Sequence, residues 1–191
     1  MLGFRPKKTI QAAAYLLRKE PGGRMNYMRL LKILYLADRE SIRVRKEQIC
    51  GGRVYAMLQG PVISPVLDMI KGSDPESYVW DRFIDRCGFD VAIRSENPGV
   101  SELSRAELRI LDQIAEAHQG QDEWALVKWC HDNLPEYQKN DPEIAGLQRK
   151  LIPLDDMLEA IGSHSSKDEI VSQANAEIYF GKLFGDHSYS H

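Results

Sequence analysis

The stretch that decides the fold is residues 28–37, MRLLKILYLA. Apolar side chains occupy almost every position, so a helix formed by it would be apolar on nearly all sides, which is typical of a helix surrounded by its own domain. We predict this central helix from about Asn26 to Lys46. Its sequence becomes charged after Asp38, and we expect its last turns to reach solvent or a partner. The cations there also suit the negative end of the helix dipole.

Shorter elements are predicted on both sides of the central helix. Thr9 is expected to cap a first helix. Residues 53–58 read as a strand, and Gly60-Pro61 after it as a tight turn. Residues 78–86 and 89–94 flank a Gly and predict a hairpin, although the period of the first arm also fits a helix.

Four further helices are predicted from residues that favour helix starts. These residues are the capping box of Ser104 and Glu107, then Asp122, then Pro153, and a second capping box of Ser166 and Glu169. The last helix is expected to reach about Phe184. The whole chain, 1–191, is therefore predicted as a single, mainly α-helical α+β domain with a small antiparallel sheet. A helical extension is predicted at 141–184 and a frayed tail at 185–191.

Charge is unevenly spread over the 191 residues. Residues 1–53 contain 13 Lys and Arg and four Asp and Glu, a net of +9, whereas residues 54–191 contain 12 and 24, a net of −12. Three interpretations stay open: a nucleic-acid face, an acidic partner, or two halves of one domain that attract each other.

The compartment is expected to be the cytoplasm. The N-terminal residues show no apolar stretch with a cleavage site, and the best apolar run, Leu30 to Ala37, is shorter than a membrane span and interrupted by Lys32. Three distant cysteines, Cys50, Cys87 and Cys130, favour buried reduced thiols over a disulfide framework. A soluble protein with no membrane contact is predicted.

No catalytic motif is found in the sequence, and we expect no enzyme activity, cofactor or metal site. Cys130-His131 is the one pair that suggests nucleophilic chemistry, but neighbouring helical residues diverge by about 100°, so a buried Cys beside a hydrogen-bonded structural His is predicted instead. The carboxylates Asp38, Glu40 and Glu47 alternate with arginines, which favours ion pairing over metal binding.

Nucleic-acid binding is considered because cations gather near the end of the central helix. They are Arg39, Arg43, Arg45, Lys46 and Arg53. The overall pI of about 6.0 is far below that of a typical DNA-binding module, which argues against direct contact. A DNA-binding autoregulator stays as an alternative.

Several spaced motifs together resemble the SocA-like antitoxin domain, also called Panacea. They are residues 27–41 (YMRLLKILYLADRES), 51–57 (GGRVYAM), Gly60-Pro61-Val62, 102–107 (ELSRAE), 124–127 (WALV) and His131. The resemblance covers about residues 9–140. The sequence departs from the family at Gly51-Gly52, where members often have Gly-Asp, and at 134–137, where a Trp commonly follows the Pro-containing turn.

This resemblance implies an antitoxin that binds and neutralises a toxin encoded beside it. Members pair with unrelated toxins, including replication inhibitors and enzymes that modify tRNA, and the founding antitoxin also delivers its toxin to an ATP-dependent protease. The partners implied are a cognate toxin and such a protease, and a homo-oligomer is left open. The contact surface is expected at the charged end of the central helix beside the Gly60-Pro61 turn. The residues expected there are Asp38, Arg39, Glu40, Arg43, Arg45, Gly60 and Pro61.

Overall fold

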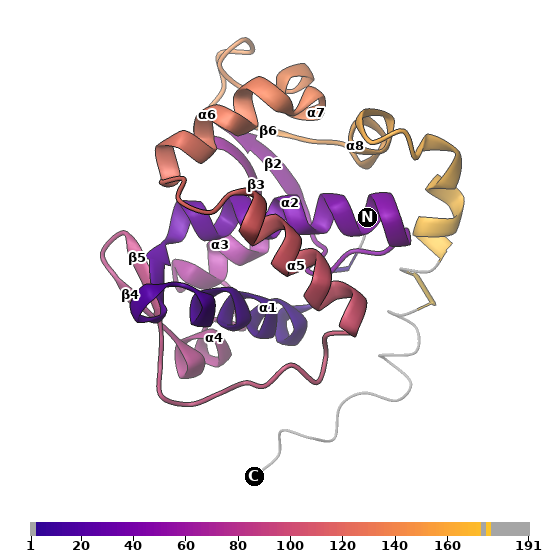
Figure 1. Ribbon diagram of the computed structural model, residues 1–191. Coiled ribbons are helices and arrows are strands. Elements are labelled where there is room, and N and C mark those ends of the chain that lie inside the picture. Colours follow the sequence, from indigo (N-terminus) through magenta and orange to yellow (C-terminus); the bar gives the residue numbers. More distant parts are fainter. Residues whose placement is uncertain (1–2, 173–174, 177–191) are drawn as a thin grey trace.

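The computed structural model describes residues 3–172 and 175–176 and shows an α+β fold with predominant helices (Figure 1). The helices are α1 (Pro6–Lys19), α2 (Tyr27–Arg45), α3 (Ser64–Ile70), α4 (Ser77–Phe83), α5 (Arg105–Ala117), α6 (Glu123–Asn133), α7 (Pro135–Lys139) and α8 (Leu154–Ala160), with 3-10 turns η1 (Pro21–Gly23) and η2 (His164–Ser166). The strands are β1 (Arg24–Asn26), β2 (Val54–Met57), β3 (Gly60–Ile63), β4 (Ile84–Cys87), β5 (Asp90–Ile93) and β6 (Arg149–Leu151). This architecture confirms the predicted fold class.

Helix α2 runs through the middle of the molecule, as its sequence predicted (Figure 1). Every residue from Arg29 to Asp38 is buried. Helices α1, α3, α5 and α6 and strands β1 and β3 pack around it. The side chain of Asn26 accepts a hydrogen bond from the Met28 N–H at 2.8 Å and caps its start. The apolar run therefore forms the core because neighbours cover it on nearly every side.

The strands form two separate three-stranded antiparallel sheets, one in the order β1-β5-β4 and one in the order β3-β2-β6. In the second sheet, Ala56 of β2 pairs with Pro61 of β3 on one side and with Lys150 of β6 on the other. Gly60-Pro61 is thus the beginning of a strand, and the predicted tight turn at these residues is wrong. The turn lies one step earlier, at residues 58–59.

The start of α1 also differs from the prediction. The helix begins at Pro6, with Arg5 at the cap position, because proline is well suited to the first helical residue. Thr9 lies inside the helix, where its hydroxyl donates a hydrogen bond to the Arg5 carbonyl at 2.8 Å. The ambiguous arm at 78–86 is helical at 78–83, which is all but the first residue of α4, and extended at 84–86 in β4. The helix interpretation holds for its first part and the strand interpretation for its last.

Three predicted helix starts are confirmed: Ser104 and Glu107 form a reciprocal capping box, the Asp122 side chain caps α6, and Pro153 precedes α8. The extension after residue 140, expected to be helical, also supplies strand β6. Helical backbone continues at 167–172 and 175–176, whereas the predicted helix end near Phe184 and the tail at 185–191 lie outside the described residues.

The cysteines and the helix lengths bear on two further expectations. All three cysteines are free thiols, but Cys87 is exposed rather than buried. It occupies the last position of β4, where the hairpin turns through solvent. Within the described ranges, no helix combines the length and the apolar character that a membrane crossing requires.

Candidate binding surface at the two ends of helix α2

Lys32 lies in the apolar part of α2 and is buried, with 1% of its surface exposed. Its ammonium donates one hydrogen bond, to the Pro61 carbonyl at 3.1 Å. An ammonium group has three N–H donors, and this is the one hydrogen bond that the side chain makes within the described residues. Lysine is almost never fully buried without an ionic partner. Lys32 is therefore the most unusual charge in the core.

Strand β3 is shaped to pass over this lysine. Gly60 has a φ of +92°, and a Cβ at this position would lie 3.0 Å from Cε of Lys32. Glycine both accepts this backbone conformation and leaves room for the lysine stem. Pro61 follows on an edge strand, where a residue without an N–H is tolerated. Gly60 and Pro61, which were expected at the contact surface, are instead buried, and they position Lys32.

A pocket of about 240 Å³ opens beside Lys32. Its lining comprises the buried residues Leu31, Lys32 and Val62, the half-buried residues Tyr27, Met28, Met57 and Leu67, and the exposed residues Leu58, Gln59, Lys71 and Gln148. Two lysines and no Asp or Glu belong to this set. Burial lowers the pKa of Lys32 to about 8, so most of the amine is still protonated at neutral pH. The pocket is positively charged and has largely apolar walls.

Aromatic side chains lie at the same end of α2 as the pocket, and one of them, Tyr27, lines it. Phe89, at the turn of the β4–β5 hairpin, is 72% exposed, and its ring stacks on Tyr27 with centroids 6.3 Å apart. Trp124 in the first turn of α6 is 57% exposed, and its neighbour Glu123 accepts a hydrogen bond from Asn26 at the start of α2. The hairpin, the start of α2 and the start of α6 lie at the same side of the molecule (Figure 1). We call this region, with the pocket, Tyr27, Phe89 and Trp124, the pocket end.

The opposite part of α2 holds the other residues expected at the surface, Asp38, Arg39, Glu40, Arg43 and Arg45, which we call the charged end. The structure does not expose Asp38, whose carboxylate is buried and accepts the backbone N–H groups of Ile49, Cys50 and Gly51 at 2.7–3.0 Å. The pKa of Asp38 is raised to about 6, because the effect of burial exceeds the opposite effect of the three N–H donors. Asp38 fixes the loop after α2 and cannot itself touch a partner.

Arg39 is also used inside the molecule. Its guanidinium donates two hydrogen bonds to Glu136 of α7, at 2.6 and 3.3 Å, and the Tyr35 hydroxyl donates a third at 2.8 Å. The Glu136 side chain is fully buried and that of Arg39 is 20% exposed. This bidentate pair joins α2 to α7.

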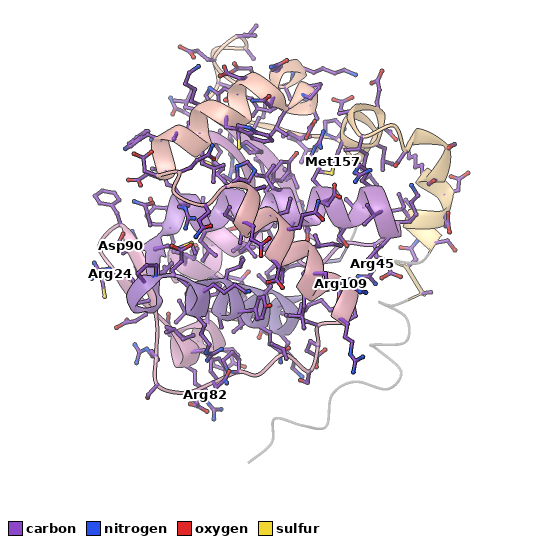
Figure 2. The ribbon with its side chains drawn as sticks, in the orientation of Figure 1. Arg24, Arg45, Arg82, Asp90, Arg109 and Met157 are labelled. Carbon is purple, nitrogen blue, oxygen red and sulfur yellow. The ribbon has the colours of Figure 1, made fainter. Side chains whose placement is uncertain are left out.

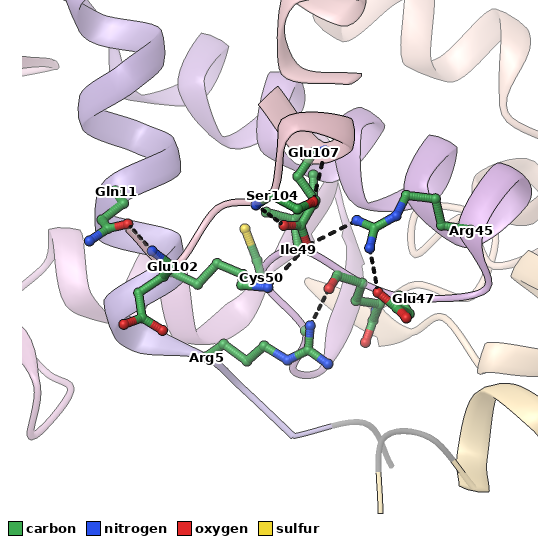
Figure 3. A network of polar contacts seen from close by, with 12 residues as sticks. Arg5, Gln11, Arg45, Glu47, Ile49, Cys50, Glu102, Ser104 and Glu107 are labelled. Carbon is green, nitrogen blue, oxygen red and sulfur yellow. Dashed lines mark hydrogen bonds and ion pairs between the residues drawn. The ribbon is translucent and has the colours of Figure 1, made fainter. Parts of the chain in front are cut away.

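Arg45 belongs to a second internal network (Figure 3). Its guanidinium lies 2.6 Å from Glu47 and 3.1 Å from Glu107, which also pairs with Lys8 of α1 at 3.0 Å. Burial by itself would raise the pKa of Glu107, but the Ser104 N–H and Lys8 outweigh it and hold that pKa below its usual value. The network joins α1, α2 and α5.

Glu40 and Arg43 remain at the surface of the charged end and pair with each other at 2.6 Å, with half of the Arg43 side chain exposed. Val44 beside them is 49% exposed. Just after the helix, the Lys46 ammonium donates to the Ser163 hydroxyl at 3.0 Å, so the segment after α8 lies against this end. Of the seven residues expected at a contact surface, Arg43 is exposed and the other six are buried or half-buried.

The charge asymmetry of the sequence has an internal explanation. Within the described residues, several ion pairs join a cation of residues 1–53 to an anion of residues 54–191. They are Lys8–Glu107, Lys19–Asp112, Arg24–Asp90, Arg39–Glu136 and Arg45–Glu107. Figure 2 shows Arg24 beside Asp90 on one side of the molecule and Arg45 on the other. The interpretation that the two halves attract each other is supported at both ends of α2.

The Cys130-His131 pair is not arranged as a nucleophile and its base. Cys130 is fully buried, and burial raises its pKa to about 12, which keeps it a neutral thiol. The His131 ring stacks on Tyr137 with centroids 4.5 Å apart, and its Nε2 has no hydrogen bond within the described residues. The buried cysteine is confirmed, and within the described residues the His131 ring is in contact through stacking on Tyr137 rather than through a hydrogen bond at Nε2. In the part of the chain that the structure describes, no three His, Cys, Asp or Glu residues are grouped as metal ligands.

The fold and the site define a small α+β domain that surrounds one central helix and has a cationic pocket at one end of it. A model of the family described as "Antitoxin SocA-like, Panacea domain" matches residues 30–135, more than half of the chain. The protein belongs to this family, as its motifs indicated. The matched residues include Lys32, Gly60, Pro61 and Lys71. No curated protein and no solved structure matches the chain.

Sequence reasoning missed the pocket end. One signal for it was available, because Lys32 is the one charged residue in the apolar run 30–37. The stacking of Tyr27 on Phe89 had no signal, since 62 residues separate them and their approach depends on the pairing of β1 with β5.

Proposed function

We propose that this protein is an antitoxin that neutralises a toxin protein by direct contact. Membership of the SocA-like antitoxin family carries the proposal. Two features of the structure support a binding role. One is the exposed aromatic side chains Phe89 and Trp124, since aromatic residues are enriched among those that dominate interface energies, and the other is the pocket lined by Tyr27 and Lys32. Neutralisation by covering an active site requires no chemistry from the antitoxin itself.

The pocket end of α2 is the contact surface in this proposal. Phe89 and Trp124 are largely exposed. The ammonium groups of Lys32 and Lys71 have hydrogen-bond donors that no described residue uses. At the charged end, by contrast, most cations are already paired with carboxylates of the same molecule. A stable interface buries about 1,200–2,000 Å² in total and depends on a few such anchors.

Co-expression with the open reading frame next to its gene tests the function. If the proposal holds, the neighbouring product alone arrests growth, this protein restores growth, and the two co-purify as a complex. A harmless neighbour that does not bind would contradict it. Rescue that depends on an ATP-dependent protease would indicate delivery for degradation, and salt-dependent binding to the promoter would indicate autoregulation.

A negative charge at Phe89 tests separately whether the pocket end is the contact surface. Phe89→Asp replaces an exposed ring by a carboxylate and is expected to weaken toxin binding at least tenfold, measured by calorimetry. Because the side chain is mostly in solvent, the variant should unfold at nearly the temperature of the wild type. Unchanged affinity would move the contact away from the pocket end.

A further inference from the structure

The pocket beside Lys32 has the properties of a carboxylate site. Its inner wall holds a buried ammonium with two N–H donors left unused within the described residues. Lys71 lines the exposed side, and its side chain makes no hydrogen bond or ion pair in the described part of the chain. No Asp or Glu belongs to the lining, although acidic residues outnumber basic ones in the chain as a whole.

The position of Lys32 is costly for the fold. A buried charge without an ionic partner destabilises a protein, and replacement by an apolar side chain of similar volume is often neutral or stabilising. Strand β3 nevertheless uses Gly60 and the Pro61 carbonyl to hold the lysine in this place. An anion that arrives in the pocket would complete the missing half of the pair.

We propose that this pocket receives a carboxylate side chain, Asp or Glu, of the partner toxin, which pairs with the ammonium groups of Lys32 and Lys71. The inference rests on the proposed function and adds the chemistry of the partner. The apolar walls formed by Met57, Val62 and Leu67 suit the aliphatic stem of such a side chain. Exclusion of water strengthens the ion pair, since the effective dielectric constant falls on burial.

The size of the pocket favours a single side chain over a nucleotide or a phosphate backbone. Its volume of about 240 Å³ is below the roughly 300–1,000 Å³ of ordinary small-molecule sites. Nucleic-acid binding depends on several cations spread along a groove. Here one buried lysine, Lys32, and one exposed lysine, Lys71, line a single pocket with largely apolar walls.

A titration of the full chain without any toxin tests the pocket alone. The probe is N-acetylglutamate N-methylamide, compared with the neutral N-acetylglutamine N-methylamide of nearly the same shape, each at millimolar concentration. In amide NMR spectra we expect saturable shifts with the acid for Met57, Leu58, Gln59 and Lys71, several-fold larger than with the amide. The shifts should disappear in Lys32→Met. Equal shifts for both probes, no saturable shift, or shifts that persist in Lys32→Met would overturn the proposal.

Toxin affinity then tests the role of the pocket in the complex. Lys32→Met is expected to raise the Kd at least tenfold, while the same substitution at the other end of the helix, Lys46→Met, changes it less than twofold. Thermal unfolding of both variants verifies that they fold. Equal affinity of Lys32→Met and wild type would refute the carboxylate contact, even with a confirmed toxin. A protein that binds the acid probe but no toxin would refute the proposed function and leave the anion site established.

Discussion

The two ends of α2 differ in how their charges are used. The charged end has many ionic side chains, yet Asp38 holds three backbone N–H groups, Arg39 holds Glu136 and Arg45 holds Glu107. The pocket end has a single charge in its apolar run, Lys32, and that charge has no ionic partner within the described residues. In this protein, therefore, the dense cluster of charges in the sequence is paired internally, whereas the isolated charge, Lys32, is the one without an ionic partner within the described residues.

This difference follows from burial. Charges near the end of a central helix still lie against other elements, and they lose hydration unless each finds a partner. The acidic second half of the chain supplies such partners to the charged end. Lys32 is surrounded by Leu31, Val62 and Cys130, none of which carries a negative charge. Each prediction below separates a structural charged end from a functional pocket end.

The largest expected effect is the loss of Glu136. Glu136→Gln leaves the Arg39 guanidinium partly buried without its anion, and breaking a buried pair on one side destabilises a protein by about 3–5 kcal/mol. Urea unfolding at neutral pH measures the free energy. The matched control is Glu40→Gln, which removes a pair whose arginine, Arg43, is half exposed, and it should change the free energy of unfolding by less than about 1 kcal/mol. Similar losses of unfolding free energy in the two variants would show that the buried pair with Glu136 does not stabilise the charged end more than a surface pair does.

The next effect is a pH dependence caused by Lys32. Its pKa is lowered from 10.5 to about 8 in the folded state, so the unfolded state binds more protons between these values and stability rises with pH there. A shift of this size corresponds to about 3 kcal/mol. The difference in unfolding free energy between Lys32→Met and wild type should therefore fall by about 3 kcal/mol as the pH increases from 8 to 10.5. Subtraction cancels the other lysines and tyrosines, and a constant difference would show that Lys32 is well solvated.

Gly60 gives a smaller effect on the same lysine. Gly60→Ala forces a residue with a Cβ to a φ of +92° and brings that atom within 3.0 Å of Lys32, and we expect a loss of about 2 kcal/mol in urea unfolding. Gly72→Ala is the control, because Gly72 has a φ of +73° and a Cβ added there would meet no atom within 4 Å. The excess loss at Gly60 measures the contact. If the two variants lose the same stability, the strand does not constrain Lys32.

Much of the fold could be predicted from local patterns. The apolar run predicted a surrounded helix, and the Ser104 and Glu107 capping box predicted the start of α5, because both signals act over a few residues. Strand β6 could not be predicted in this way. Its position beside β2 depends on residues almost a hundred positions apart, and its sequence, Arg149–Leu151, has no alternation long enough to recognise.

The site was predicted less well, for a related reason. The cluster of cations from Arg39 to Arg45 is visible in the sequence. The carboxylates that pair with Arg39 and Arg45 are Glu136 of α7 and Glu107 of α5, which are far away in the sequence. Gly60-Pro61 was predicted as a tight turn, whereas in the structure it begins a strand that passes over Lys32, a residue 28 positions earlier in the sequence. A sequence shows which charges exist and leaves open which of them are paired.

The smallest expected effect concerns Arg43, the exposed cation of the charged end. Arg43→Glu replaces the i,i+3 pair with Glu40 by a repulsion. Because half of the Arg43 side chain is exposed and solvent screens the charge there, we expect stability to change by less than about 1 kcal/mol. Because our proposal places the contact surface at the pocket end, it requires toxin affinity to stay within twofold of the wild type in calorimetry at physiological salt. A Kd that rises tenfold would return the interface to the charged end. In that case Arg43 and Val44, both exposed there, would become the anchors, and Phe89→Asp should then bind toxin like the wild type.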